Sequence, residues 1–261
     1  MSSMSSTATD AERRAQYDEM NRAKAFFSTL IQACMDGDEE KVKKDLSEYV
    51  KKNPHTTTED VLREFQSEGK TIFHVAASSG RPNILRFLLD QIGDKTSVVN
   101  KQDKNGFSPL IFATISESSE CMQELIKHGA SVNVANSTGA APIHFAAGDG
   151  SVARMEILVG RKADVNLMSE TGTSIHWAAG KGRTDAIKYL ISQGADINVR
   201  NENGLTAVLM AACAGSDDTC ATLISAGADV GDIVSGNLTV MHICAENGME
   251  TSVHALLGVP R

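Results

Sequence analysis

Four histidines recur at almost constant spacing, and imidazole nitrogens can bind zinc or act as general bases. His74, His144, His176 and His242 stand in segments of similar sequence. A zinc site usually brings two ligands close together in the chain, as in HxxxH or CxxC, and the sequence contains neither pattern. We therefore interpret the four histidines as structural residues and predict no metal and no other cofactor.

Acidic residues recur in the same manner. Asp164, Asp196 and Asp229 occupy one turn position in successive segments, which is typical of a repeated structural element rather than of paired catalytic carboxylates. The phosphate-binding and hydrolase motifs GxxxxGKS/T, GxGxxG and GxSxG do not occur in a strand–helix setting. The sequence therefore predicts that the chain is not an enzyme.

The cysteines indicate a reducing compartment. There are five, an odd number, and no two form a CxxC pair, which fits the cytoplasm, with the nucleus as an alternative. Cys213, Cys220 and Cys244 lie in adjacent segments and could sense oxidants. Because cysteine is among the most buried residue types, we favour core packing for them.

Composition and charge exclude two classes of partner. Apolar residues make up 41% of the 261 residues, yet no apolar run approaches the roughly 18 residues that span a bilayer. The net charge of -8 argues against binding to a phosphate backbone. We predict neither a membrane nor a nucleic acid as partner. Lysines are concentrated in residues 41–52 and acids after residue 200, and we interpret both regions as solvated faces.

The elements that carry these residues are repeats. The position held by His74 recurs at steps of 37, 33, 32, 33 and 33 residues, and an apolar pair follows each of the six positions after 14 residues. Each unit predicts two short helices, with small residues such as Ala146 and Ala147 in the first and a helix-ending glycine such as Gly150 after it. A turn string follows, as in Gln193–Asn198. The six segments that define the repeat are Lys70–Gly80, Phe107–Glu117, Ala140–Gly150, Thr173–Gly182, Leu205–Gly215 and Leu238–Gly248.

The unit resembles the ankyrin repeat, whose signature is T-P-L-H-x-A with a period of about 33. The resemblance implies an all-α solenoid of stacked helix pairs with β-hairpin finger loops, in which the repeated histidine hydrogen-bonds loop backbone and neighbouring repeats. Three departures are local. Four extra residues around Gln91–Val99 are expected to lengthen one finger, one residue is missing before Thr173, and Glu117 replaces a helix-ending glycine and is expected to distort its turn.

The repeats, residues 70–258, are predicted to follow two other regions. Residues 1–20 are expected to be a flexible tail. Residues 21–69 are expected to form a capping helix pair with a polar outer face and a connector that contains a short helix at Glu59–Gln66. Residues 259–261 resemble a thrombin-cleavable tag remnant, and the lack of a polar cap after Leu256 and Leu257 suggests a fragment of a longer protein.

The resemblance implies that partners bind to a concave surface of finger tips and inner helices. Leu167 and Met168 stand out there with Ile233, since an apolar tip has no obvious core to fill, although it could equally pad the adjacent finger. Trp177 follows a repeated histidine and is expected to pack between helices. The candidate partner-binding residues are Lys101, Asp103, Lys104, Ile115, Asn136, Asp149, Leu167, Met168, Glu170, Lys181, Arg200, Glu202, Asp232, Ile233 and Glu246.

Two asparagines also resemble modification sites. The strings around Asn166 and Asn198 are similar to asparaginyl hydroxylation sites of ankyrin proteins. We favour turn hydrogen bonding as their role.

These observations predict a monomeric scaffold or adaptor that recognises a protein or peptide. One alternative is a regulatory ankyrin module of a larger enzyme or channel. Another is the N-terminal part of a co-chaperone-like protein, because the runs GTSIHWAAGKG, NGLTAVLMAACAG and GNLTVMHICAENG are similar to ankyrin–tetratricopeptide proteins of plants and protists.

Overall fold

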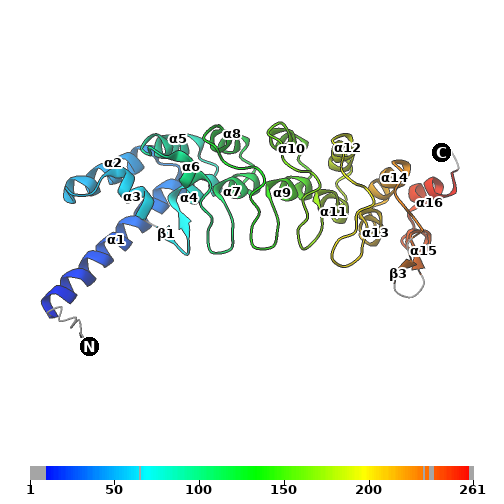
Figure 1. Ribbon diagram of the computed structural model, residues 1–261, viewed down its shortest axis with the longest axis horizontal. Coiled ribbons are helices and arrows are strands. Elements are labelled where there is room, and N and C mark those ends of the chain that lie inside the picture. Colours follow the sequence, from blue (N-terminus) through cyan, green and yellow to red (C-terminus); the bar gives the residue numbers. More distant parts are fainter. Residues whose placement is uncertain (1–9, 65, 232, 235–237, 259–261) are drawn as a thin grey trace, which may run out of the picture.

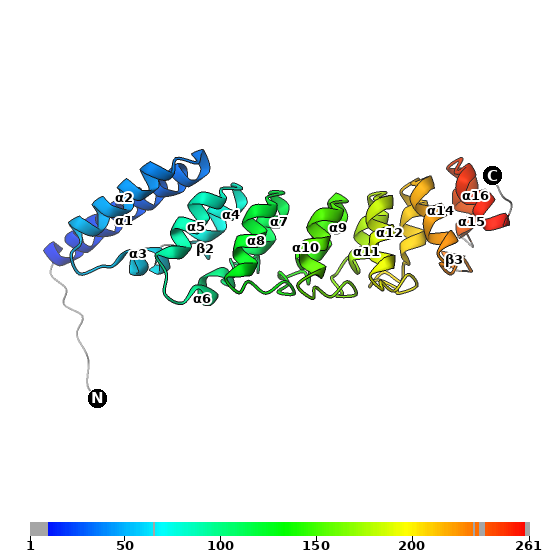
Figure 2. The same cartoon turned by 90° about the horizontal axis from the view of Figure 1, so that it is seen from above.

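The computed structural model describes residues 10–64, 66–231, 233–234 and 238–258. The chain forms an elongated stack of helix pairs arranged in three tiers, with outer helices above, inner helices beneath and finger loops hanging below (Figure 1). Seen from above, the pairs stand side by side in a row from the N-terminal to the C-terminal end (Figure 2). The predicted all-α solenoid is confirmed. The predicted tag remnant, residues 259–261, lies outside the described residues, and so do residues 1–9 of the predicted flexible tail.

Each inner helix is short because its first residue follows an extended capping residue and its last precedes a turn. Proline stands at the start of α7 and α9, where the absent N–H costs no hydrogen bond. Alanine pairs such as Ala146–Ala147 and Ala178–Ala179 are fully buried and let neighbouring inner helices approach closely. The inner helices are α4 (Ile72–Ser78), α7 (Pro109–Ile115), α9 (Pro142–Asp149), α11 (Ser174–Gly180), α13 (Ala207–Cys213) and α15 (Val240–Glu246).

The outer helices bury one apolar face against the inner tier and expose the other. In α12, Ala186, Ile187 and Leu190 are buried while Asp185 and Lys188 face solvent. Each buried leucine or isoleucine contributes about 1.5–3 kcal/mol to folding. The outer helices are α5 (Pro82–Asp90), α8 (Ser119–Lys127), α10 (Val152–Val159), α12 (Thr184–Ser192), α14 (Asp217–Ser225) and α16 (Glu250–Leu257).

The N-terminal helix pair consists of α1 (Asp10–Asp36) and α2 (Glu39–Lys52). The expected flexible tail is therefore wrong from residue 10 onward. Residues 10–20 contain no glycine or proline and are rich in alanine, arginine and glutamate, which favour helix. The two helices pack through buried residues such as Leu30 and Leu46, and the rings of Phe26 and Tyr49 stack with centroids 4.1 Å apart.

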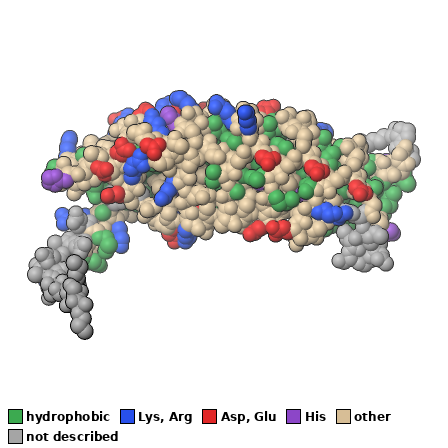
Figure 3. All heavy atoms as spheres, viewed as in Figure 1, with side chains coloured by type: hydrophobic (Ala, Val, Ile, Leu, Met, Phe, Trp, Pro, Cys, Tyr) green, Lys and Arg blue, Asp and Glu red, His purple; other side chains and the backbone are tan. Residues whose placement is uncertain are grey.

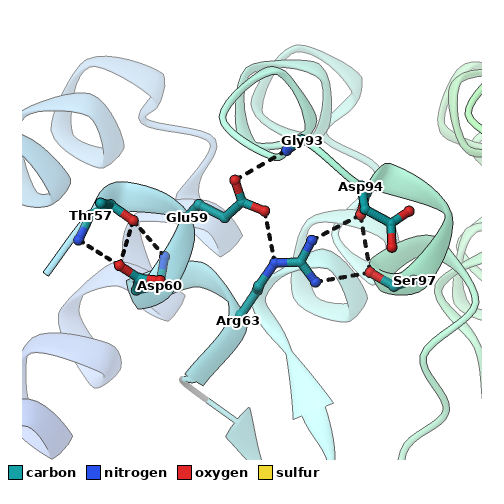
Figure 4. A network of polar contacts seen from close by, with 7 residues as sticks. All are labelled: Thr57, Glu59, Asp60, Arg63, Gly93, Asp94 and Ser97. Carbon is teal, nitrogen blue, oxygen red and sulfur yellow. Dashed lines mark hydrogen bonds and ion pairs between the residues drawn. The ribbon is translucent and has the colours of Figure 1, made fainter.

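The connector contains α3 (Thr58–Glu64) and a hairpin of β1 (Gln66–Ser67) with β2 (Lys70–Thr71). The four extra residues of the first repeat do not lengthen a finger, contrary to expectation. They contribute to α6 (Lys95–Val99), whose Val98 and Val99 are buried. Arg63 of α3 donates to the Asp94 carbonyl and the Ser97 hydroxyl, and Glu59 accepts from the Gly93 N–H (Figure 4). The insertion thus joins the connector to the first repeat.

Two turns use a side-chain-bearing residue where most other repeats have glycine. Glu117 has a φ of 60° and Lys162 a φ of 65°, both in the left-handed region. The Glu117 N–H still donates to Thr114 and the Ser118 N–H to Ala113, the same pattern that Gly150 makes. The expected distortion is therefore absent, and the turn instead carries an unfavourable backbone conformation.

The last repeat begins with a second hairpin, in which β3 (Ile233–Val234) pairs antiparallel with β4 (Leu238–Thr239). Within the described parts of the chain, no helix has both the length and the apolar character needed to cross a membrane.

Candidate functional site

Repeated histidines fix the fingers to the inner helices. Nδ1 of His74 accepts from the Thr71 N–H at 3.0 Å, so Nε2 carries the proton and donates to the Phe107 carbonyl of the next finger at 3.1 Å. His144 and His176 make the same pair of bonds. The structural interpretation is confirmed for these three histidines. His242 shares only the first bond, to the Thr239 N–H, among the described contacts.

Burial acts on the three inner histidines in one direction. It lowers the pKa of His74, His144 and His176 below the ordinary value, and the backbone carbonyl contacts offset only part of that effect. Each neutral ring links the backbone before its inner helix to the following finger through two hydrogen bonds, and we call this pair of bonds a histidine bracket. Among the described residues, no cluster of three or more His, Cys, Asp or Glu side chains could hold a metal ion.

One predicted site residue belongs to the finger turn and not to the surface. Asp103 is only 7% exposed, and its Oδ1 accepts from the Asn105 and Phe107 N–H groups, both at 2.9 Å. Asn136 holds the next turn in the same way, through Thr138 and Ala140, and is half-buried. The prediction of Asp103 as a partner-binding residue is therefore wrong, because its carboxylate accepts hydrogen bonds from backbone amides of the turn.

Neighbouring fingers are joined through their backbones and through asparagine side chains. The Ser137 N–H donates to Asn105 and the Glu170 N–H to Thr138. Asn166 donates to the Gly194 carbonyl at 3.1 Å and accepts from Asp196 at 2.8 Å, whereas Asn198 accepts from Asp229 at 2.8 Å. Both asparagines are exposed and have the turn role favoured from sequence. Their hydroxylation stays a prediction.

Ten of the predicted binding residues are exposed on the fingers or at the ends of inner helices. Asp232 lies outside the described residues, and the side chain of Ile233 is not among those described. Leu167 is half-buried and packs against the hydrophobic core. Met168 beside it is 40% exposed. The exposed residues are Lys101, Lys104, Ile115, Asp149, Met168, Glu170, Lys181, Arg200, Glu202 and Glu246.

Several of these charges already have partners within the chain. Lys104 pairs with Glu68 at 2.8 Å, and Asp149 pairs at 3.2 Å with Arg154. Arg154 is buried and also donates to the Thr114 carbonyl of the preceding repeat. Asp149 thus orients an arginine that joins two inner helices.

Sequence reasoning missed a row of aromatic side chains on the inner tier. Phe112, Phe107, Phe145 and Trp177 are half-buried, and successive ring centroids lie 5.5, 5.9 and 5.3 Å apart. We call these four residues the aromatic row. The signal was available, since the residue after each repeated histidine position is large and apolar in the first five repeats: Val75, Phe112, Phe145, Trp177 and Met210.

Trp177 lies in this row and bridges it to a finger. Its Nε1 donates to the Ser169 hydroxyl at 3.1 Å, and its ring lies 5.7 Å from that of His144. The expected packing between helices is therefore only part of its environment. A β-carbon built on Gly148 would lie 3.3 Å from the indole and 3.4 Å from Lys181 Nζ, so the glycine lies close to both side chains.

Two lysines lie near the aromatic row: Lys70 at its N-terminal end and Lys181 near Trp177. Lys70 Nζ lies 4.9 Å from the centre of the Phe112 ring, an attractive cation–π geometry. In the view of Figure 3, hydrophobic side chains show in patches along the middle of the stack, basic side chains gather over the N-terminal half, and the C-terminal half shows more acid than base. The face in this view therefore carries more base toward the N-terminal end and more acid toward the C-terminal end.

Repeat period, paired short helices, histidine brackets and finger loops together define a class of repeat protein. The sequence profile described as ankyrin repeats, in three copies, matches residues 30–136, 96–169, 132–201 and 175–259. The chain belongs to the ankyrin repeat family.

Curated relatives match over shorter stretches. The chain is 27% identical over 105 residues to the E3 ubiquitin-protein ligase KEG of Arabidopsis thaliana, which covers 40% of this chain and 6% of that protein. It is 33% identical over 72 residues to alpha-latrotoxin-Lh1a of Latrodectus hasselti and 35% identical over 72 residues to alpha-latrotoxin-Lg1a of Latrodectus geometricus. Each toxin match covers 28% of this chain and 5% of the toxin. The chain thus spans only a small share of these relatives.

Proposed function

We propose that this chain is a scaffold that binds a protein or peptide along the surface formed by its inner helices and fingers. The observation that carries the proposal is the aromatic row. Four rings in continuous contact cross three repeats and remain half-exposed, although a stack could bury its inner tier with alanine alone.

Energetics favour a partner on this row. Binding energy in protein interfaces is concentrated in a few aromatic or arginine side chains that are surrounded by weaker contacts. Ile115 at the end of an inner helix and Met168 on a finger are further exposed apolar side chains. Peptide backbone laid across them would be held by polar groups such as Lys181 and Glu170, which are exposed on a helix end and a finger.

Substitution of the row should weaken binding without unfolding the stack. Phe145→Ala and Met168→Ala each remove an inner-surface side chain, and Tyr189→Ala on outer helix α12 is a matched control, because Tyr189 is also a half-buried aromatic. Partners are captured from native cells by the wild-type chain, and each variant is then compared for retention of the same partners. Circular dichroism checks that the helices persist.

We expect the two inner-surface variants to lose the partner and Tyr189→Ala to keep it. A partner that all three variants retain equally places the binding surface elsewhere. Because Trp177 is the single tryptophan, a change in its emission on addition of purified partner gives an independent readout.

A second candidate is a regulatory module within a larger protein. It is favoured by the relatives, in which the matched stretch is a 5–6% part of a longer chain. Determination of the full transcript decides between the candidates: a linked catalytic or channel domain supports the module, whereas a linked tetratricopeptide domain supports a co-chaperone-like protein.

A further inference from the structure

A pocket opens at the N-terminal end of the aromatic row, where α1 approaches α4. Its volume is about 460 Å³. Both the N-terminal helix pair and the first two repeats contribute walls, so the pocket does not belong to a single repeat. Besides two serines, the lining residues are Ile31, Met35, Lys70, His74, Val75 and Phe112.

The walls of this pocket are apolar and partly open to solvent. Met35 is 51% exposed, and Ile31, Val75 and Phe112 are half-buried. Methionine side chains adapt to ligands of different shape, and exposed ones are frequent on binding surfaces. The walls therefore offer apolar contacts to a side chain of matching size.

The lining of the pocket carries a single charged side chain. Lys70 is the sole charged lining residue at neutral pH, since burial lowers the pKa of His74 and keeps its ring neutral. Two acids outside the lining act on it: Glu68 lies 2.8 Å from Lys104 and also interacts with Lys70, and Asp103 interacts with His74 while its carboxylate accepts from turn amides. Lys70 is exposed, and its described contact is the Phe112 ring rather than a carboxylate.

We propose that this pocket seats an apolar side chain of a partner peptide and that Lys70 pairs with an aspartate or glutamate next to that side chain. The proposal rests on the proposed function and names the chemistry that one end of the inner surface recognises. From the pocket the peptide continues across Phe112 onto the rest of the aromatic row, which lies in direct contact with that wall. The acidic group is a side chain within the peptide.

Selection from a library of random linear peptides tests the proposal. The peptides are fused to a phage coat protein through their C-termini, so that no free terminal carboxylate is present. Selected sequences are then synthesised with amidated C-termini, and their affinities are measured by fluorescence anisotropy. The receptors are the wild-type chain, Lys70→Gln, Lys70→Glu, Met35→Ala and the control Lys41→Glu, which makes the same charge change on an exposed residue of α2.

We expect selected peptides to carry an acid beside an apolar residue. Their affinity should fall about fivefold with Lys70→Gln and more than tenfold with Lys70→Glu, and it should fall with ionic strength. Lys41→Glu should change it less than twofold, and Met35→Ala should weaken binding in proportion to the size of the apolar residue. Selection on Lys70→Glu should enrich basic peptides in place of acidic ones.

Three outcomes overturn the proposal and are distinguishable. Peptides that need Phe145 but are insensitive to the charge at residue 70 refute the acid pairing and leave the scaffold function standing. Failure to select any peptide that depends on Phe145 or Lys70 counts against both. The same peptides are also synthesised with a free C-terminal carboxylate, and affinity that appears only in that form refutes an internal acid as the recognised group.

Discussion

His144 donates from Nε2 to the carbonyl oxygen of Leu167, 2.9 Å away in the following finger. In the other two brackets the acceptor is the residue just before the next inner-helix cap, Phe107 or Leu205. The third finger lacks one residue, and its Ser169 and Gly172 form a tight bridge. The bracket is kept because another carbonyl of the shortened finger takes the acceptor role.

Acid should destabilise the stack through these buried rings. The pKa of His74, His144 and His176 lies below 6.5 in the folded chain and near 6.5 when unfolded, so the unfolded state binds more protons as pH falls. Stability is then constant above about pH 7 and declines from about pH 6.5 downward, by at most about 1.4 kcal/mol per pH unit for each proton. Urea denaturation midpoints measured between about pH 8 and about pH 5 check this decline in stability.

A variant with leucine at one bracket tests the assignment. His144→Leu is suitable because the fifth repeat already carries Leu209 at this position. It should lower stability at neutral pH, by about 1–3 kcal/mol, and reduce the acid sensitivity by one proton. An unchanged pH slope would assign the acid effect to other groups.

The same position explains an orphaned hydroxyl. Thr71, Thr173 and Thr239 place Oγ1 near Nδ1 of the histidine three residues later. Thr206, which precedes α13, has Leu209 at that position instead, and its buried Oγ1 has no hydrogen-bond partner. Thr206→Val should be neutral or stabilise by up to about 1 kcal/mol, because it removes an unsatisfied polar atom.

Thr173→Val is the matched control and should destabilise by about 1 kcal/mol, since its hydroxyl lies 3.0 Å from His176 Nδ1. Thermal melts of both variants measure the difference. Equal losses in the two would mean that the Thr206 hydroxyl has a partner after all.

Left-handed backbone should set the effect of two complementary substitutions. Glu117 has a φ of 60°, and Glu117→Gly should stabilise the second repeat by about 1 kcal/mol. Gly215→Ala makes the reverse change at a φ of 66°, where an added β-carbon meets no atom within 4 Å, and should cost about 1 kcal/mol. Denaturant titration gives both values. A loss with Glu117→Gly would show that the glutamate side chain stabilises the turn.

Cysteine reactivity should separate one thiol from four. Cys213 is exposed, so the predicted core packing is wrong for it, whereas the other four cysteines are buried. Burial raises the pKa of Cys34 and Cys220 to about 12, which suppresses the thiolate that reacts. A chromogenic disulfide reagent should therefore modify one thiol quickly in the native chain and five after unfolding, and Cys213→Ser should abolish the fast phase. A fast phase that persists in that variant would contradict the burial.

Substitution by aspartate should affect the two asparagines that join neighbouring fingers, Asn166 and Asn198, to different extents. Asn166→Asp loses the donor to the Gly194 carbonyl and places negative charge beside it, so we expect a loss of about 1–3 kcal/mol. Asn198 shows only an acceptor role, toward Asp229, within the described residues, and Asn198→Asp should cost less. Thermal melts at neutral pH compare the two variants. A larger loss with Asn198→Asp than with Asn166→Asp would contradict these hydrogen-bond roles.

Much of the fold was predictable because an ankyrin unit is specified locally. The capping position before each inner helix, the alanine pairs and the repeated histidines recur with the period, so each unit confirms its neighbours. The insertion was misjudged because α6 has no counterpart in the other repeats, and its position depends on Arg63, some thirty residues away in the chain. Residues 10–20 were misjudged because a serine-rich beginning outweighed a run of good helix formers.

The binding surface was only partly predictable. Finger tips follow from the repeat alignment, and most of the residues named there are exposed. Asp103 turned inward because its carboxylate caps turn amides, and an aspartate two residues before an asparagine carries that signal only when turn chemistry is considered. The aromatic row escaped notice because only Trp177 was considered, as a residue following a histidine, and the equivalent positions of the other repeats were not compared with it.

Neighbour-only packing has a mechanical consequence. Each repeat touches little beyond the adjoining ones, so bending of the stack is the softest motion available to it. The row from Phe112 to Trp177 crosses three repeats at a single level. A peptide bound along the row would contact three repeats at once and oppose bending between them. Binding would therefore stiffen the stack.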